Sequence, residues 1–155
     1  MTPEQAWRAV TMPERAGGYS YNFAFAGGAT SSFETTATTA ADLDGATVHT
    51  NHALDGTVAT VCPAGSEGSV SRLARMQALT SGRETWTVEA ACMLLADHGA
   101  DGQDICVHPD PAEGPESSAI MFGMVADVAN RTLWVAPGNP CRNGFEPYPL
   151  DDLLA

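Results

Sequence analysis

The sequence predicts an α+β protein in which antiparallel sheets are layered with helices. Three observations support this fold class. The expected strands are grouped in hairpins and do not alternate with helices. The expected order of elements is helix, hairpin, strand, two helices, strand, hairpin. No internal repeat or long linker divides the 155 residues. We therefore expect a single domain over residues 1–155.

The first expected elements are a helix and a hairpin. Pro3–Thr11 has proline near its start and apolar residues on one helical face, which predicts a short helix. Tyr19–Ala26 alternates aromatic and polar residues, as a strand does. Gly27–Gly28 is typical of a hairpin turn and predicts a return strand over Ala29–Thr36.

The middle of the chain predicts a third strand and two helices. A turn over Asp42–Gly45 leads into the expected strand Ala46–Asn51. Asp55–Gly68 is rich in small residues and is expected to be a loop. Apolar residues at helical spacing predict a helix over Ser69–Leu79 and a second helix from a cap at Thr85 to His98.

The last part predicts a short strand and a second hairpin. Ile105–His108 is expected to be the strand, and the proline-rich, acidic stretch Pro109–Ser117 a loop. Ser118–Asp127 and Arg131–Ala136 are the two strands of the expected hairpin. The segment Pro137–Pro140 ends it, because proline cannot continue a strand ladder.

The charge balance excludes some classes of partner. The seven basic residues are all arginine and face 19 acidic residues, for a formal net charge of −12. Binding to nucleic acid or to an anionic membrane surface needs clustered basic residues, so we expect neither partner.

Location is inferred from the terminus and the cysteines. The chain begins without a basic and apolar leader, and no apolar run reaches about 18 residues, so we expect neither a secretory signal nor a membrane span. The four cysteines form no Cys-x-x-Cys pair. We therefore expect a reducing, cytoplasmic setting rather than a disulfide framework.

The densest polar cluster is Thr47–His52, at the end of the expected third strand. An asparagine amide such as that of Asn51 can donate a hydrogen bond to an oxyanion. The alternative is that Asn51 and His52 only satisfy the hydrogen bonds of a turn. His49 and His52 would point to opposite faces of a strand, and the Cys and His residues lack the dense spacing of structural zinc motifs, so we expect no metal.

A second polar segment, Gly68–Arg75, covers the start of the expected helix Ser69–Leu79. Ser69 or Ser71 can cap this helix, and Arg72 lies in its first turn, where the helix dipole disfavours a positive charge. A residue placed against local preference is often functional.

Five segments, in order along the chain, resemble the later half of the acyl-CoA:6-aminopenicillanic acid (isopenicillin-N) acyltransferase family. This family belongs to the N-terminal-nucleophile hydrolases. The resemblance covers roughly residues 6–150, and its segments are Gly17–Asn22 leading to Glu34, Thr50–Leu54, Ser69–Arg75, Asp104–Pro109 and Trp134–Cys141.

The resemblance implies an αββα fold, of which this chain would form an incomplete half. It also implies acyl transfer or hydrolysis at a non-peptide amide, by a Cys that autoproteolysis exposes as a first residue, with its own α-amine as base. Asn51 would help to form the oxyanion hole. Arg72, with Ser71 beside it, would orient the nucleophile, and Thr50 and His52 would contact substrate.

The expected nucleophile is not among the cysteines of this chain, because none of them follows a glycine as the family's nucleophile does. Two interpretations stay open. The chain is the non-nucleophile part of an enzyme, or it is a truncated non-catalytic remnant or binding domain. The expected ligand is a small-molecule amide or acyl donor. We expect no cofactor, although acyl-CoA could serve as a substrate, and the expected protein partner is a chain carrying the Cys or a second copy.

Overall fold

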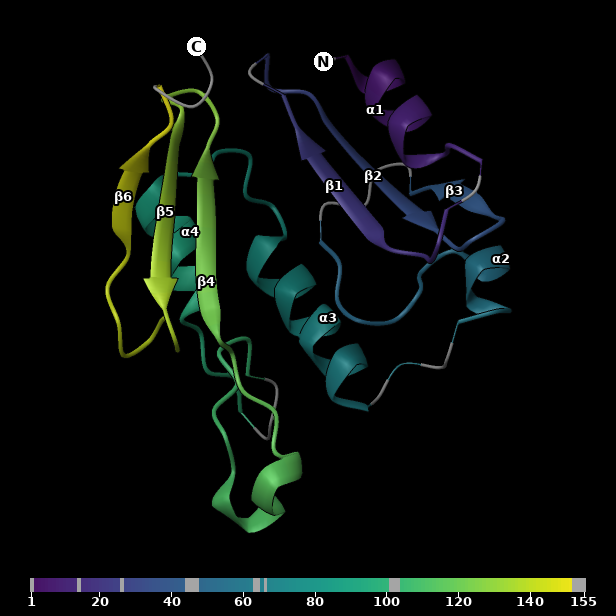
Figure 1. The fold of residues 1–155 in the computed structure, drawn as a ribbon. Helices are drawn as coiled ribbons and strands as arrows, with labels where there is room; N and C mark the ends of the chain where they lie inside the picture. Colours follow the sequence, from purple (N-terminus) through teal and green to yellow (C-terminus); the bar gives the residue numbers. More distant parts are fainter. Residues whose placement is uncertain are drawn as a thin grey trace. The chain divides into compact units, whose positions relative to one another are not determined.

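The computed structural model describes residues 2–13, 15–25, 27–43, 48–62, 65, 67–100 and 104–151. The chain divides into two compact units, Met1–Leu73 and Ala74–Ala155, called here the first and the second unit. Each unit combines one three-stranded antiparallel sheet with helices, so the α+β class is confirmed (Figure 1).

The sheet of the first unit has the order β1-β2-β3 and carries a helix on one face. The helix α1 has a capping box, in which Thr2 accepts from the backbone of Gln5 and the Gln5 side chain accepts from the backbone of Thr2. The elements of this unit are α1 (Pro3–Val10), β1 (Ser20–Ala24), β2 (Thr30–Thr35), β3 (Ala40–Asp42) and α2 (Gly56–Ala59).

The two faces of this sheet differ in chemistry. On one face the ring of Phe33 lies 4.9 Å from that of Trp7 in α1 and 6.0 Å from that of Phe23 in β1. The next residue of β2, Glu34, points to the other face and is only 2 % exposed. Ser32 lies on the same face as Glu34 and is buried too. The aromatic face therefore forms the core with α1, and the polar face is left for the site.

The third strand of the first unit was placed wrongly from the sequence. Strand β3 covers Ala40–Asp42, because the backbone N–H of Thr36 donates to the carbonyl of Thr39 at 2.8 Å and turns the chain back at once onto β2. Of the expected strand Ala46–Asn51, residues 46 and 47 lie outside the described residues, and 48–51 have no regular secondary structure.

The expected loop Asp55–Gly68 contains a short helix. The Asp55 side chain accepts from the backbone N–H groups of Thr57 and Val58, which starts α2, and Val58 is buried. A helix of four residues is too short to give a periodic apolar pattern, so only its cap could have indicated it.

The second unit has a sheet of order β4-β5-β6, and α4 packs against β4. Helix α3 begins in the first unit and ends in the second, close to its expected bounds. The elements are α3 (Glu67–Thr80), α4 (Val88–Leu95), the 3-10 helix η1 (Pro111–Glu116), β4 (Phe122–Asp127), β5 (Thr132–Pro137) and β6 (Glu146–Pro149).

Several expectations for the second unit were wrong. Helix α4 is capped by Thr87 instead of Thr85 and ends at Leu95, before His98. Ile105–His108 is not a strand, because its backbone makes isolated bonds to Asp97 and Ile120 and no ladder. The strand β6 was missed because its sequence, Glu-Pro-Tyr-Pro, contains two prolines, which only an edge strand tolerates.

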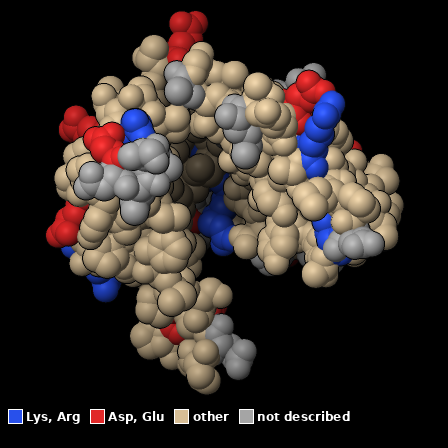
Figure 2. Space-filling model, turned by 45° about the horizontal axis from the view of Figure 1, so that its top comes forward, with Lys and Arg blue, Asp and Glu red and all other residues tan. Residues whose placement is uncertain are grey.

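Several arginines hold elements of their own unit together. Arg15 donates to the carbonyls of Thr36 and Thr39, and Arg75 makes two bonds of 2.9 Å to Asp97. On the face that Figure 2 shows, basic and acidic atoms lie in small separate groups among uncharged residues. No helix in the described part of the chain is both long enough and apolar enough to cross a membrane.

Candidate functional site

A pocket of about 270 Å³ opens on the polar face of the first sheet. Strand β2, the segment 48–55 and the residues after α2 all contribute to its wall. The lining residues with functional side chains are Tyr19, Glu34, His49, Asn51, His52 and Cys62.

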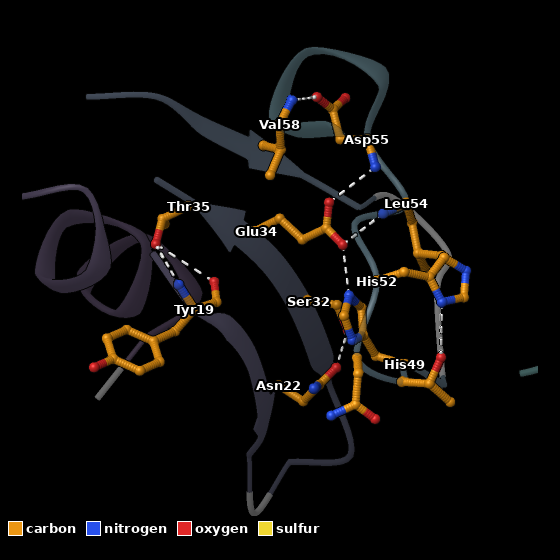
Figure 3. A network of polar contacts seen from close by, with 12 residues as sticks. Tyr19, Asn22, Ser32, Glu34, Thr35, His49, His52, Leu54, Asp55 and Val58 are labelled. Carbon is orange, nitrogen blue, oxygen red and sulfur yellow. Dashed lines mark hydrogen bonds and ion pairs between the residues drawn. The ribbon is translucent and has the colours of Figure 1, made fainter. Parts of the chain in front are cut away.

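Glu34 is the centre of the first polar network in this pocket (Figure 3). Its carboxylate accepts from the backbone N–H groups of Leu54 at 2.7 Å and Asp55 at 2.8 Å. His49 Nε2 lies 2.5 Å from the same carboxylate. Three of the roughly four acceptor positions of this buried carboxylate are thus occupied, so Glu34 fixes the course of the segment 48–55.

Ser69 is the centre of the second network, and it is fully buried in α3. Its Oγ accepts from the backbone N–H of Asn51 at 3.0 Å and lies 2.8 Å from His52 Nδ1 and 3.1 Å from the hydroxyl of Thr50. The Thr50 hydroxyl also donates to the Ser69 carbonyl at 3.0 Å. Because the Ser69 hydroxyl is buried and shared among these groups, it positions residues 50–52 and is not a nucleophile.

The side chains of Asn51 and Arg72 meet directly. The guanidinium of Arg72 donates to Asn51 Oδ1 at 2.8 Å. This bond occupies the acceptor end of the Asn51 amide, so the Nδ2 group is the end left to donate. Asn51 lines the pocket and is exposed, which makes this amide accessible to a ligand.

The structure thus brings four of the five predicted site residues together. Thr50 and His52 bind Ser69, and Arg72 binds Asn51. Ser71 lies apart from this network, because its hydroxyl donates to the Gly68 carbonyl of its own helix at 3.2 Å.

Ser69 was named from the sequence only as a capping residue. A signal for its burial was nevertheless present. Ser69 and Leu73 are the two buried residues of α3, and they stand four positions apart, on one face of the helix.

Gly65 and Cys62 are pocket residues that sequence reasoning did not select. A Cβ atom on Gly65 would lie 2.4 Å from the Cβ of His52, so only glycine allows the backbone to approach the His52 side chain this closely. Cys62 is a free, half-buried thiol in the pocket wall.

A second cluster, in the second unit, consists of His98, Cys106, His108 and Cys141 and is called here the Cys/His cluster. One side-chain nitrogen or sulfur from each residue lies within 4.8 Å of all the others. Partial desolvation of the sulfur, followed by the neighbouring Cys106, raises the pKa of the Cys141 thiol. Burial, followed by Arg142 and His98, lowers the pKa of His108.

In comparisons with known proteins, the sequence matches no family model, and no curated protein matches it.

Proposed function

We propose that the pocket of the first unit is the oxyanion-stabilising side of a site for acyl transfer or amide hydrolysis, in an αββα fold of the N-terminal-nucleophile type. The observation that carries the proposal is the 2.8 Å bond from Arg72 to Asn51. It occupies the acceptor end of an exposed amide in the pocket wall and leaves the Nδ2 group to donate, and the resemblance to the acyltransferase family assigns these two positions to the same site.

The chemistry needs a donor where negative charge develops. A thiolate attacks the acyl carbon, the carbonyl oxygen takes up the charge, and collapse expels the amine with the proton taken from the thiol. A hydrogen bond from Asn51 Nδ2 to that oxygen would stabilise the tetrahedral intermediate. Arg72 touches Asn51 and is therefore a positioning residue. His52, held by Ser69 beside Asn51, is placed to contact the substrate.

The nucleophile is proposed to come from a segment or chain that carries an N-terminal Cys. One face of the second sheet supports such a partner, because Phe122 and Met124 of β4 are 55 % and 51 % exposed and Tyr148 of β6 is 50 % exposed. The strand register places all three on the same face. Apolar sheet faces are normally covered, and the second layer of an αββα fold would cover this one.

The test is an assay of the chain co-expressed with each adjacent reading frame of its genome, using a panel of N-acyl p-nitroanilides as substrates. In the active combination, Asn51→Ala should lower kcat by about 10²-fold, since it removes an oxyanion donor. Gln77→Ala removes an exposed amide from the same helix as Arg72 and should leave kcat unchanged.

Two results would contradict the proposal. A loss in kcat below about threefold for Asn51→Ala would reduce that residue to a structural role. Activity of the chain by itself that is abolished by Cys62→Ser would place the nucleophile inside this pocket, and the site would then not depend on a second chain.

A second candidate function is non-catalytic binding of a small amide or acyl compound. The pairing of the pocket's polar groups with one another favours it, because the side chains of Glu34 and Ser69 are already engaged with neighbouring residues. In this case calorimetry detects binding of acyl amides that Asn51→Ala weakens, and no adjacent reading frame gives turnover.

A further inference from the structure

We propose that the Cys/His cluster of the second unit binds one zinc ion as a structural Cys₂His₂ site. The proposal is independent of the function proposed for the pocket, since its four residues and their contacts all lie in the second unit. It rests on the convergence of two thiols and two imidazoles that are far apart in the sequence.

Three segments bring the ligands together. His98 follows α4, Cys106 and His108 lie between α4 and η1, and Cys141 follows β5, 33 positions after His108. Hydrogen bonds join these segments. The backbone N–H of Cys106 donates to the carbonyl of Asp97 at 3.0 Å, and Asn139 Nδ2 donates to the carbonyl of Val107 at 2.7 Å. These bonds keep the ligand-bearing segments close together.

The distances match a tetrahedral site. Zinc bonds of about 2.3 Å to sulfur and about 2.0–2.1 Å to nitrogen put the ligand atoms of a tetrahedron roughly 3.3–3.8 Å apart. His108 Nε2 lies 3.0 Å from Cys141 Sγ and 4.0 Å from Cys106 Sγ, and all four ligand atoms lie within 4.8 Å of one another. Shifts of about an ångström at most would complete the site.

The donor set favours zinc over other common ions. Thiolates and imidazoles suit zinc, whereas magnesium and calcium prefer oxygen ligands. Four protein ligands leave no open position, which is typical of a structural site. Binding releases the two thiol protons to solvent, because the ligating sulfurs are thiolates.

Residues next to the four proposed ligands are also of the kind that supports a zinc site. Asp104 Oδ1 lies 3.5 Å from His98 Nδ1, so the carboxylate would orient this ring and leave Nε2 for the metal. Asn139 Nδ2 lies 3.6 Å from Cys106 Sγ and can donate to the thiolate. Histidine ligands of zinc usually have such a carboxylate or carbonyl partner.

The second unit also needs a constraint of this kind. Among its described residues, the fully buried apolar side chains are those of Cys106 and Ala136, and no residue of α4 is fully buried. A small core supplies little stability, and small domains often add a metal or disulfides. A zinc ion would join the end of α4, the following segment and the chain after β5.

The test measures zinc in the purified full chain after dialysis against buffer with trace zinc. We expect about one zinc per chain. Replacing zinc by Co²⁺ should give the intense visible bands of a tetrahedral site together with a thiolate-to-cobalt charge-transfer band. Cys141→Ser and Cys106→Ser should each lose the metal. The matched control is Cys92→Ser, which removes a half-buried thiol of α4 outside the cluster and should keep it.

The design separates loss of ligands from loss of fold. Cys141 is exposed, so its replacement by serine removes a ligand without opening the core. Asp104→Asn keeps all four ligands and should weaken zinc binding by about tenfold. Wild-type protein with less than about 0.2 zinc per chain and no cobalt spectrum would overturn the proposal, as would a Cys106–Cys141 disulfide in protein purified under reducing conditions. Full zinc occupancy in Cys141→Ser would also overturn it.

Discussion

Glu34 illustrates how one side chain positions the segment 48–55 in the pocket wall. It lies on the polar face of β2, and its carboxylate collects two backbone N–H groups and the ring of His49. None of these partners belongs to a regular helix or strand. The position of the segment that carries Asn51 therefore depends on hydrogen bonds to a buried carboxylate. In a strand, backbone hydrogen bonds to a neighbouring strand would fix it instead.

Glu34→Gln should destabilise the protein by about 2 kcal/mol, because the amide turns a donor toward a backbone N–H and leaves a buried group unpaired. Urea unfolding measures the change. The control is Glu4→Gln, which removes an exposed pair with Arg8 and should change stability by less than about 0.5 kcal/mol. Equal effects of the two substitutions would contradict the function assigned to Glu34.

At the scale of residues, the sequence could predict part of the candidate site. Asn51 and Arg72 were selected by resemblance to a family, and the structure places them in contact. Ser69 was not separated from Ser71 because both can cap a helix, and burial decides between them. The Cys/His cluster was missed because its members come from three segments, and sequence spacing carries no information on how distant segments converge.

At the scale of elements, the hairpins were predictable and the connections were not. The strands β1, β2, β4 and β5 lie within their expected ranges, apart from one residue at the end of β5, because alternation and turn residues act locally. The third strand was misplaced because a run of Thr and Ala has no distinctive period. Strand β6 was missed because its pairing with β5 compensates for a poor local propensity.

The β4–β5 hairpin carries a prediction on pH. Hydrogen bonds from the side chain and then the backbone of Asn130 hold the pKa of Asp127 below its usual value. Because the pKa of this carboxyl is lower in the folded state, its ionised form stabilises the fold at pH values above the unfolded-state pKa of about 3.9. This stabilisation is lost as the pH falls through the lower pKa of the folded state.

Asn130→Ala should therefore raise the pKa of Asp127 toward its ordinary value and lower the unfolding midpoint at pH 7. Titration of the Asp127 carboxyl by NMR measures the first effect, and thermal unfolding the second. The difference in midpoint between wild type and variant should narrow below about pH 3.9. A difference that stays constant with pH would show that Asn130 acts through backbone geometry alone.

At the scale of the whole molecule, the two units obtain their order in different ways. The first unit packs α1 on an aromatic sheet face and holds its site by polar networks. Among the described residues of the second unit few side chains are fully buried, and two thiols and two imidazoles lie close together instead.

Hydrogen exchange with and without a chelator tests this division. With zinc bound as proposed, chelation should speed the exchange of backbone amides in 104–108 and 138–142 by at least tenfold. Amides of Leu54 and Asp55 should keep their rates, because Glu34 holds them without a metal. If chelation speeds amide exchange equally in both units, the metal does not stabilise the second unit alone.

The hydroxyl of Ser69 also determines how the effects of substitutions in the pocket combine. Thr50 and His52 contact this oxygen through their side chains, and Asn51 through its backbone N–H, so a substitution at Thr50 or His52 changes the lone pairs or the proton available to the other groups. Contributions from such a shared anchor are not additive. Variants at Thr50 and His52 will therefore not have additive effects, and the second substitution will cost less stability after the first than it does alone.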